Sequence, residues 1–359
     1  MVRQLLPPKI MTDNHSSISI PGPILVTGAS GFIGGHLCRQ LVAQGHRVLG
    51  VTRSADAELP EGVERHVLDL GEEEQVIRLF EKENPQTIFH LAGHVVAKRG
   101  VEEVMPSFQC TLATTVHLLM AAQKHSKGRF IQIGSLEEPV KMGDPPASPY
   151  AASKAAASGY ARMFHALYGL RVVIARVFMV YGPDQKDRKK LIPYVIDSLL
   201  KGESPRLSSG KRLVDWIHVA DVVEGLIALA ATPGIEGQTV DLGSGELVSV
   251  HSLVQRLAEI TPSTGSLIYD PAGDRPMEQV RQANVDATAS LTGWRPKFSL
   301  DEGLADTVRW HQDRHGKSAA PADKADSGWI KKLAGWKFAP ETALFLGVDF
   351  WGRIESLVV

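Results

Sequence analysis

The sequence predicts an α/β fold in which a doubly wound parallel sheet stands beside a smaller α/β lobe. Two observations carry this prediction. Strand-like and helix-like runs alternate from Ile24 onward, and such alternation favours a parallel sheet with helices on both faces. A glycine-rich turn joins the first strand to the first helix. We therefore expect a ligand at the carboxyl ends of the strands, where sheets of this kind bind.

The glycine-rich turn reads Thr27-Gly28-Ala29-Ser30-Gly31-Phe32-Ile33-Gly34 and follows the apolar run Ile24-Leu25-Val26. Glycines three residues apart let the backbone turn sharply and approach a pyrophosphate, and the helix N-terminus offers free N–H donors. The order of strand, turn and helix predicts a Rossmann-type dinucleotide site. The residues assigned to it are Gly28, Ser30, Gly31, Phe32, Ile33 and Gly34. The alternative is an ordinary glycine-rich turn.

The remaining elements of the first half follow in the same alternation. After a helix at 36–44, the apolar pattern predicts strands at 47–52, 63–68, 87–92, 129–135 and 171–180. Between them, helices are predicted at 72–83, 108–125 and 150–168. The helix at 72–83 is acidic and amphipathic and ends near Asn84-Pro85.

Beyond residue 181 the alternation loosens, and the chain divides into unequal parts. Residues 22–181 form the predicted dinucleotide-binding domain. Residues 182–315, with short helices between loops rich in Gly, Pro and Ser, form a substrate lobe interleaved with it. The polar residues 1–21 are predicted to be a disordered tail, and 316–328 a linker. The aromatic-rich residues 329–359 are an extension that the sequence does not explain.

Composition narrows the function classes. The chain has 359 residues, 43% of them hydrophobic, and a formal net charge of −1. This balance gives no sign of nucleic-acid or membrane binding, and no apolar run is long enough to cross a bilayer. Cys38 and Cys110 lie in predicted helices and are expected to be small buried residues, with no metal site. A cytoplasmic enzyme is the expectation.

A tyrosine and a lysine one helical turn apart suggest proton chemistry. Tyr150 and Lys154 stand at i and i+4, on one face of a helix that begins after Pro149. A free tyrosine has a pKa of about 10, and a nearby ammonium is expected to lower it. Ser135 ends the preceding strand, where its hydroxyl can face the same cleft. The alternative is a surface helix without chemistry.

These features together resemble the extended short-chain dehydrogenase/reductase family, in its NAD-dependent epimerase/dehydratase group that acts on nucleotide sugars. The resemblance runs from about Pro23 to His315. It rests on the glycine-rich turn and on further motifs in the same order: Asp69-Leu70, Phe89-His90-Leu91-Ala92-Gly93, Ser135, Tyr150/Lys154, Arg176-Val-Phe-Met-Val-Tyr-Gly-Pro183, Asp215-Trp-Ile-His-Val-Ala-Asp221 and Leu291-Thr-Gly-Trp-Arg-Pro296.

The resemblance implies a role for individual residues. Tyr150 would be the general acid/base, Ser135 would hydrogen-bond the reacting oxygen, and Lys154 would position the nicotinamide ribose. Asp69 would contact the adenine. Further cofactor contacts would come from Tyr150 and Lys154 themselves and from Leu70, Leu91, Ala92, Gly93 and Val177. A homodimer through the helices at 108–125 and 150–168 is also implied, and the small residues Ala155, Ala156 and Ala157 permit close packing there.

The end of the second predicted strand departs from the family pattern. Members that prefer NAD carry an acidic residue there for the ribose 2′-hydroxyl, but this chain reads Val51-Thr52-Arg53-Ser54. Arg53 can pair with a 2′-phosphate through its planar guanidinium. NADP(H) is therefore favoured and NAD(H) is the alternative. Arg53 as a solvated loop charge is the competing explanation.

The predicted substrate pocket departs in several places. Dehydratases of the family carry Thr-Asp-Glu where this chain has Ser135-Leu136-Glu137, and a leucine cannot protonate a leaving hydroxyl. A 4,6-dehydratase is thus disfavoured, although Glu137 remains a catalytic candidate. Met179 replaces a frequent asparagine, and Val214 a frequent arginine that binds diphosphate. The other substrate-binding candidates are His94, Arg212, Arg275 and Arg281.

The favoured function is an NADPH-dependent reductase of a nucleotide-linked 4-keto-6-deoxyhexose. An NAD-dependent nucleotide-sugar 4-epimerase is the alternative, because the same residues return the hydride when the cofactor stays bound. A cofactor-sensing regulator on the same fold would need the glycine turn but neither Tyr150 nor Lys154, and is disfavoured. The sequence does not decide between reduction and epimerisation.

Overall fold

The computed structural model describes residues 20–315, except 97, 127, 142, 275 and 276. Most of the predicted tail, the linker at 316–328 and the extension at 329–359 lie outside these residues, and so does the candidate Arg275. The described residues form three sheets. The largest has seven strands in the order β10-β6-β5-β4-β1-β2-β3, and every pairing within it is parallel.

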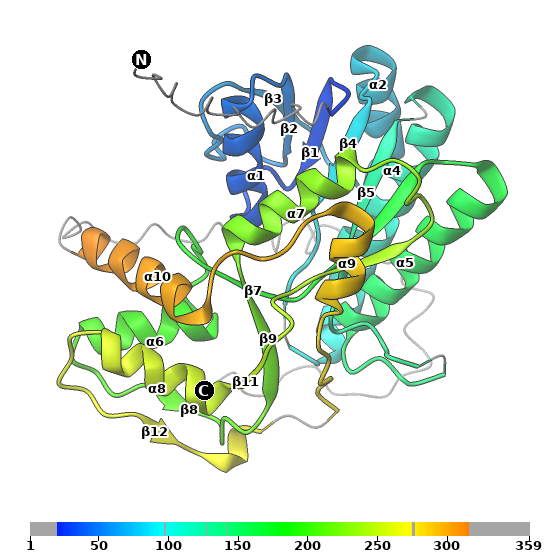
Figure 1. Cartoon of the computed structure of the whole chain (residues 1–359). Coiled ribbons are helices and arrows are strands. Elements are labelled where there is room, and N and C mark those ends of the chain that lie inside the picture. Colours follow the sequence, from blue (N-terminus) through cyan, green and yellow to red (C-terminus); the bar gives the residue numbers. More distant parts are fainter. Residues whose placement is uncertain (1–19, 97, 127, 142, 275–276, 316–359) are drawn as a thin grey trace, which may run out of the picture. The chain divides into compact units, whose positions relative to one another are not determined.

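The seven-stranded sheet confirms the predicted fold (Figure 1). The order reverses between β1 and β4, which is where a doubly wound sheet opens a crevice for a ligand. Its strands are β1 (Ile24–Thr27), β2 (Val48–Thr52), β3 (Val63–Val67), β4 (Thr87–His90), β5 (Arg129–Ser135), β6 (Val172–Val177) and β10 (Thr239–Leu242).

Helices cover both faces of this sheet (Figure 1). One face carries α1 (Phe32–Ala43) and α7 (Val219–Ala231), and the other carries α2 (Glu73–Glu83), α4 (Thr114–Ala121) and α5 (Pro149–Tyr168). Alternate residues of a strand point to opposite faces, so Val26 joins one buried cluster and its neighbour Leu25 the other. Burial on both sides explains why the inner strands β1, β2, β4 and β5 read as largely apolar runs, whereas the edge strand β3 is mostly exposed.

Two predicted elements are wrong in detail. The predicted helix at 108–125 is a composite of α3 (Val104–Ser107), a π-helical segment Phe108–Ala113, α4, and a second π-helical segment Ala122–Ser126, with a 3₁₀ turn Val101–Glu103 before it. The predicted strand at 171–180 is two strands. Phe178 still donates its N–H to the Leu242 carbonyl at 3.0 Å, but the chain then leaves the large sheet as β7 (Met179–Tyr181).

The rest of the chain builds the second lobe and also returns to the large sheet. β7 lies beside β9 (Leu213–His218), which pairs with β11 (Leu247–Ser249), and β8 (Arg206–Leu207) pairs with β12 (Ile268–Tyr269). Around these strands pack α6 (Leu191–Leu200), α8 (Val250–Ile260) and α10 (Leu300–His315). A 3₁₀ turn covers Pro271–Gly273, and α9 (Val285–Thr292) packs on β10 of the large sheet.

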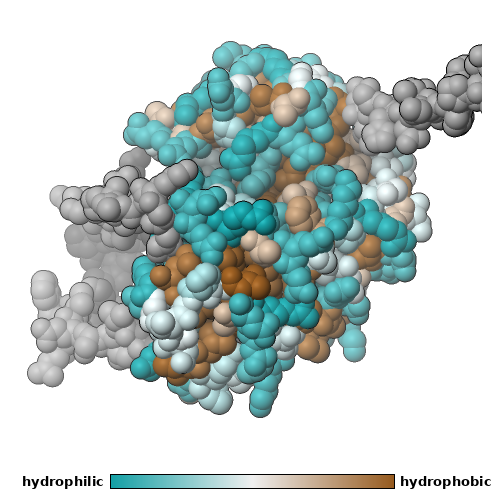
Figure 2. All heavy atoms as spheres, turned by 60° about the vertical axis from the view of Figure 1, so that its left-hand side comes forward, coloured by the Kyte–Doolittle hydropathy of each residue, from teal (hydrophilic) through white to brown (hydrophobic). Residues whose placement is uncertain are grey.

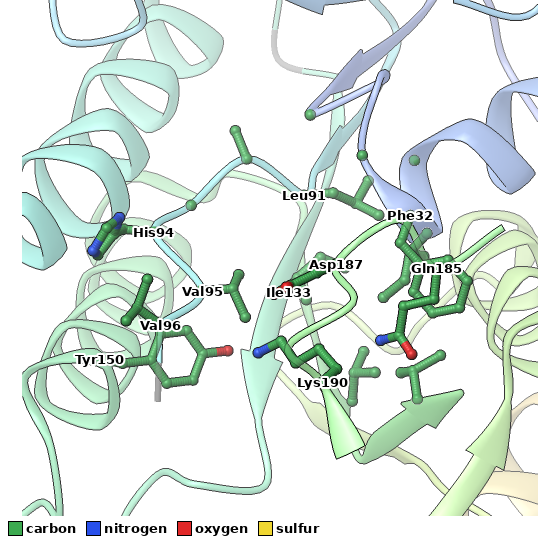
Figure 3. Close-up of a pocket in the computed structure, with 18 of the residues that line it drawn as sticks. Phe32, Leu91, His94, Val95, Val96, Ile133, Tyr150, Gln185, Asp187 and Lys190 are labelled. Atoms are coloured by element: carbon green, nitrogen blue, oxygen red, sulfur yellow. The ribbon is translucent and has the colours of Figure 1, made fainter. Parts of the chain in front are cut away.

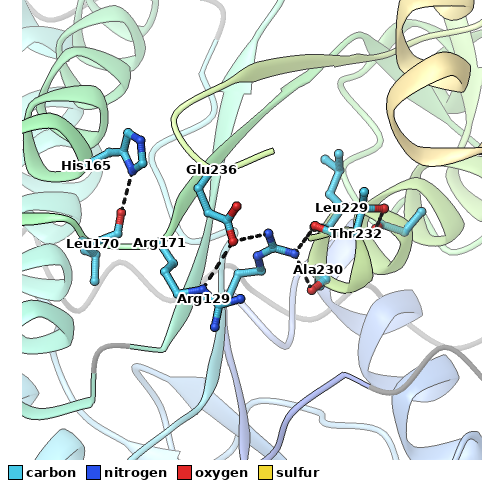
Figure 4. Close-up of polar contacts among 9 residues, drawn as sticks. Arg129, His165, Leu170, Arg171, Leu229, Ala230, Thr232 and Glu236 are labelled. Carbon is cyan, nitrogen blue, oxygen red and sulfur yellow. Dashed lines mark hydrogen bonds and ion pairs between the residues drawn. The ribbon is translucent and has the colours of Figure 1, made fainter. Parts of the chain in front are cut away.

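A buried arginine fastens α7 to the large sheet (Figure 4). Arg129, at the start of β5, donates to the carbonyls of Leu229 at 3.2 Å, Ala230 at 3.0 Å and Thr232, and its other nitrogen pairs with Glu236 at 2.5 Å. The last carbonyls of a helix have no partner within the helix and carry partial negative charge. Arg129 satisfies them and so fixes where α7 ends on the sheet.

The outer surface is mixed in polarity. Figure 2 shows one face on which hydrophilic residues cover much of the area, with smaller apolar patches between them. Within the described part of the chain, no helix combines the length and apolarity that crossing a bilayer requires.

Candidate active site

A large cavity runs along the carboxyl ends of the central strands and continues into the second lobe. Its volume is about 1580 Å³, which exceeds a typical small-ligand pocket of roughly 300–1,000 Å³. The residues that line it come from the glycine-rich turn, the ends of β2, β4, β5 and β6, the start of α5, and the segments 184–194 and 206–216. The cavity therefore has room for two ligands end to end.

The glycine-rich turn forms one wall and fits a pyrophosphate. Gly28 has φ +68°, and a Cβ there would lie 2.9 Å from the Ala92 nitrogen. A Cβ on Gly34 would lie 2.1 Å from the Gly28 carbonyl oxygen, so both positions need glycine. α1 begins with Gly31 as N-cap and no side-chain cap. The first N–H groups of this helix are thus left for an anion, as the sequence predicts.

The far end of this wall would hold the adenosine part of a dinucleotide. Arg53 and Asp69 both line the cavity. Asp69 accepts the N–H of Gly71 at 2.8 Å, which orients its carboxylate. Arg53 is exposed and its side chain has no ion pair or hydrogen bond with the described residues. A free guanidinium here can meet a ligand anion. The other assigned cofactor contacts that line the cavity are Leu70, Leu91, Ala92, Gly93 and Val177.

Ser135, Tyr150 and Lys154 come together at the middle of the cavity. Ser135 is the last residue of β5 and is buried, and its Oγ accepts the Glu137 N–H at 3.2 Å. α5 begins one residue before Tyr150, because Ser148 caps it by accepting the Ala151 N–H at 3.1 Å and Pro149 suits the first helical position. The Nζ of Lys154 lies 5.9 Å from the centre of the Tyr150 ring.

Burial dominates the electrostatics of this trio. It raises the pKa of Tyr150 to about 12, against a hydrogen bond with Ser135 that favours the phenolate. It also lowers the pKa of Lys154 to about 8, although the charge of Glu138 opposes this change. The sequence-based expectation that the ammonium leaves Tyr150 with a lowered pKa is therefore wrong for this structure. Desolvation is the largest effect on Tyr150, and the negative charges of Glu137 and Glu138 raise its pKa further.

Lys154 also has a fixed orientation. Its ammonium is buried and donates to the carbonyl of Ile133 at 2.9 Å. A Cβ on Gly93 would lie 3.9 Å from this ammonium, so the lysine reaches the loop after β4 as well as β5. The ammonium thus points between the two strand ends where a nicotinamide ribose would lie.

The substrate side of the cavity contains a network of charges around Arg212. Its guanidinium pairs with Glu137 at 2.7 Å and with Glu278 at 3.2 Å, and it also donates to the Gln279 carbonyl at 3.1 Å. Arg212 and Val214 both line the cavity, as does Met179. Glu137, a catalytic candidate, is thus held in an ion pair. It can donate a proton only if that pair breaks.

Two other candidates are placed differently from each other. His94 lines the cavity (Figure 3), but its Nε2 is within 2.7 Å of Glu103, so its ring is already engaged. Arg281 is not among the residues that line the cavity. It donates to the carbonyl of Pro139 at 3.2 Å and supports the loop after β5 from behind.

Sequence reasoning missed the cations on the opposite wall. Lys190, at the N-cap of α6, lines the cavity, and Figure 3 shows Lys190 and Tyr150 pointing into it from opposite sides. Tyr194, Arg206 and Trp216 also line the cavity. The lysines at 186, 189 and 190 form a short basic run in the sequence, which was the available signal. Only the fold shows that this run faces the strand ends.

Comparison with known proteins agrees with this geometry. The sequence model of the NAD dependent epimerase/dehydratase family matches residues 24–243. A dTDP-glucose 4,6-dehydratase of Xanthomonas campestris pv. campestris is 30% identical over 328 residues, which cover 80% of this chain and 92% of that protein. A UDP-glucose 4-epimerase of Mycolicibacterium smegmatis is 29% identical, with 81% of this chain and 98% of that protein covered.

Solved structures give the same result. A UDP-glucose 4-epimerase of Thermotoga maritima with UDP-glucose superposes with a TM-score of 0.73 at 26% identity and covers 81% of this chain and 99% of its own. The Thermus thermophilus UDP-glucose 4-epimerase in complex with NAD gives a TM-score of 0.71 at 29% identity, with 80% of this chain and 98% of its own covered. The chain belongs to the NAD-dependent epimerase/dehydratase family of extended short-chain dehydrogenases/reductases.

Proposed function

We propose that this protein is a nucleotide-sugar 4-epimerase, which transfers hydride between a nicotinamide cofactor and C4 of a nucleotide-diphosphate hexose. One observation carries the proposal. Ser135, Tyr150 and Lys154 meet in the cavity, while the neighbouring position that would supply an acid for elimination is the buried Leu136. These side chains suffice to move a proton at a sugar hydroxyl while hydride is exchanged.

The cavity fits a dinucleotide on its own geometry. The uncapped start of α1 offers N–H donors to a pyrophosphate, and Asp69 and Lys154 stand where an adenine and a nicotinamide ribose would lie. When bound, the cofactor would accept the hydride from C4 and give it back. Relatives of known structure carry NAD, as the Thermus enzyme does, which supports NAD as the cofactor of an epimerase.

Tyr150 would hold or release the proton of the sugar O4. A pKa of about 12 keeps the phenol protonated near neutral pH, the form that donates to a newly formed alkoxide. Its action as a base in the other half-reaction needs a cation to stabilise the phenolate, and the Lys154 ammonium beside the ring supplies one. The Ser135 hydroxyl would donate to the same oxygen and stabilise developing charge there.

The second lobe would bind the nucleotide diphosphate. Arg212 and Lys190 place positive charge on the substrate side of the cavity, and arginine suits bidentate contact with phosphate. Because Arg212 is paired with Glu137 and Glu278 in this structure, an entering phosphate would exchange with one of these carboxylates. The relatives that are named for UDP- and dTDP-sugars support this substrate class.

A 4,6-dehydratase is a poorer fit, although dehydratases are among the relatives. Elimination needs an acid that protonates the leaving hydroxyl. Leu136 has no proton to give, and the neighbouring Glu137 is held by Arg212. A cofactor-sensing regulator is also a poorer fit, because such a protein would need no catalytic tyrosine.

A second candidate is the NADPH-dependent reductase of a 4-keto-6-deoxyhexose. Its support is Arg53, an unpaired guanidinium at the end of β2 that faces the adenosine side of the cavity. An arginine there accommodates a 2′-phosphate, and NADPH consumption drives net reduction. We rank the epimerase first, and its support is the NAD carried by a related epimerase.

We also propose a homodimer. A row of exposed apolar side chains covers the composite helix before β5 and the outer side of α5. These residues are Val101, Met105, Phe108, Met120, Tyr160 and Leu167. An apolar surface of this kind marks a protein contact, and light scattering at micromolar concentration tests it. A monomer mass would contradict the dimer.

The epimerase proposal is tested by incubating the purified protein with NAD⁺ and each of UDP-glucose, UDP-galactose, dTDP-glucose and UDP-glucuronate. Chromatographic separation of C4 epimers should show interconversion of at least one pair. A parallel incubation of a 4-keto-6-deoxy substrate with NADPH tests the reductase through loss of the reduced-nicotinamide absorbance. Conversion only in that second incubation would reverse the order of the two candidates.

A further inference from the structure

A buried glutamate lies directly behind the proposed catalytic serine. Glu138 is 7% exposed, and its Oε1 accepts two hydrogen bonds, from the Ser135 N–H at 2.8 Å and from the Ser158 hydroxyl at 3.1 Å. The backbone N–H of Glu138 donates in turn to the Ser135 carbonyl at 3.2 Å. Ser135 is therefore held on both sides of its Cα by one residue.

The backbone is shaped to admit this carboxylate. A Cβ on Gly134 would lie 2.7 Å from Glu138 Oε1, a separation that is too short for two non-bonded atoms. A side chain at this penultimate position of β5 would therefore push the carboxylate away from the Ser135 N–H. The absence of a side chain on Gly134 leaves the space that the Glu138 carboxylate occupies behind Ser135.

Through Ser158 the same carboxylate reaches the helix that carries the other two residues. Ser158 is fully buried and stands one turn after Lys154 on the same face of α5. Lys154 makes its own link to β5 through the Ile133 carbonyl at 2.9 Å. One bond from β5 and one from the loop after it therefore tie this region to α5, and they fix Ser135 relative to Lys154 and, one turn earlier, to Tyr150.

The charge of Glu138 also acts on this group. Among the charged and titratable groups near Lys154, Tyr150 comes from α5, His90 from β4 and Glu138 from the loop after β5. Of these, Glu138 is the anion that favours the ammonium. The charge of Glu138 also acts on Arg281, and the charges of Glu137 and Glu138 both raise the pKa of Tyr150.

We propose that Glu138 is a positioning residue of the active site, which fixes Ser135 against the helix of Tyr150 and Lys154 and brings a buried negative charge to this group. The roles of Ser135, Tyr150 and Lys154 in this statement rest on the proposed function. The position and the charge of Glu138 do not depend on the proposed function. Neither sequence reasoning nor the family resemblance assigned this residue.

Three variants separate its two contributions. Glu138→Gln keeps an oxygen acceptor for Ser135 and Ser158 but removes the charge. Glu138→Ala removes both, and leaves two buried donors without an acceptor, which destabilises the fold. Ser158→Ala breaks only the link to α5. Glu259→Gln, an exposed glutamate on α8, is the matched control. Thermal unfolding and circular dichroism confirm that each variant is folded.

The effect of the Glu138 charge is measured as the pKa of Lys154, in the absence of substrate. NMR of protein labelled with ¹³C at the lysine Cε gives the titration of each lysine, and Lys154→Arg identifies the signal. We expect a pKa of about 8 in the wild type and a value lower by about one unit in Glu138→Gln, because an adjacent opposite charge typically shifts a pKa by one unit or more. Ser158→Ala and Glu259→Gln should leave it unchanged.

Steady-state kinetics test the positioning role of Glu138. At pH 8 the one-unit shift should lower kcat of Glu138→Gln about fivefold, through the protonated fraction of Lys154, and at pH 6 the loss should nearly vanish. Glu138→Ala, with Ser135 unsupported, should lose about tenfold at both pH values, since small misplacements are costly in catalysis. An unshifted Lys154 in Glu138→Gln, or full activity at pH 6 in folded Glu138→Ala, overturns the proposal.

If the wild type turns over no C4 substrate, the proposed function fails while the Lys154 titration still decides on Glu138. If Glu138→Ala does not fold, Glu138→Gln carries the charge test, and Ser158→Ala carries the positioning test through a few-fold loss of kcat at pH 6. Unaltered kcat in Ser158→Ala would then count against positioning.

Discussion

The carboxylate of Glu137 accepts a hydrogen bond from the guanidinium of Arg212 at 2.7 Å. One residue follows the end of β5 in the large sheet, and the other precedes β9 in the second lobe. The pair joins the two parts of the cavity, and it brings together two residues that the sequence assigned to separate roles. Glu137 also contacts the proposed catalytic serine, because its N–H donates to the Ser135 Oγ at 3.2 Å.

Replacing Arg212 should affect binding more than chemistry. In Arg212→Met the substrate diphosphate loses a charge-assisted contact, so KM for the nucleotide sugar should rise about 10- to 100-fold while kcat changes little. Arg295→Met, which removes an exposed arginine paired with Asp286, is the control. Steady-state kinetics at several substrate concentrations check this. An unchanged KM would show that Arg212 only holds Glu137.

Tyr150→Phe should abolish turnover and spare cofactor binding. The change removes the proton donor, a loss of about 10²- to 10⁴-fold for general acid–base catalysis, but leaves the ring and the glycine-rich turn in place. Tyr160→Phe, on the exposed side of the same helix, provides the matched comparison. Turnover assays and nicotinamide fluorescence titration measure the two quantities. Residual turnover near the wild-type rate would mean that another group carries the proton.

Arg53→Ala tests cofactor choice. If Arg53 meets a 2′-phosphate, the variant should bind NADPH at least about tenfold more weakly, since a hydrogen-bonded charge pair contributes roughly 1.5–3 kcal/mol, and its NADH affinity should barely change. Isothermal titration of both cofactors into wild type and variant makes the comparison. Equal effects on the two cofactors would identify Arg53 as an ordinary surface charge and favour NAD.

Acid should destabilise the protein through His90. This residue links β1 to α4, with Thr27 Oγ1 at 2.8 Å and Thr115 Oγ1 at 3.0 Å, and burial lowers its pKa from 6.5 to about 3. Below pH 6.5 the unfolded chain takes up a proton that the folded chain refuses. Stability is therefore full above that pH and declines as the pH falls, by roughly 1–2 kcal/mol between pH 7 and 5.

Urea denaturation at pH 7 and pH 5 measures this loss. His90→Asn, which keeps polar contacts to both threonines but does not titrate, should be less stable at pH 7 and should lose less stability on acidification than the wild type. Buried His218, with a pKa lowered to about 4, remains in both proteins and cancels in the difference. The same pH dependence in wild type and variant would mean that folding does not lower the pKa of His90.

The large sheet was predictable because its inner strands are buried on both faces and read as short, largely apolar runs between helices. The glycine-rich turn was predictable for a local reason, since its glycines, strand and helix are contiguous. The departure of the chain from the sheet after Phe178 was not, because residues 171–180 form one apolar run, and only pairing with β9, more than thirty residues later, divides it.

The candidate site also combines residues that local sequence patterns indicate with contacts that such patterns do not indicate. Motif spacing proposed Ser135, Tyr150 and Lys154, and all three line the cavity, but the pKa values of Tyr150 and Lys154 depend on burial that no local pattern encodes. The pairing of Glu137 with Arg212 joins positions 75 residues apart. In the sequence Glu138 is an ordinary loop carboxylate, and only the fold shows that it is buried. For both glutamates, contacts between residues distant in the sequence determine the surroundings of the side chain.

The most direct test of the account is the fate of the C4 hydrogen. UDP- and dTDP-hexoses deuterated at C4 are incubated with the wild type and NAD⁺, and the products are analysed by NMR and mass spectrometry. Direct hydride transfer predicts a C4-inverted product that retains deuterium at C4, and no product with Tyr150→Phe. A product whose C4 hydrogen comes from solvent, or a 4-keto-6-deoxy product, would contradict it.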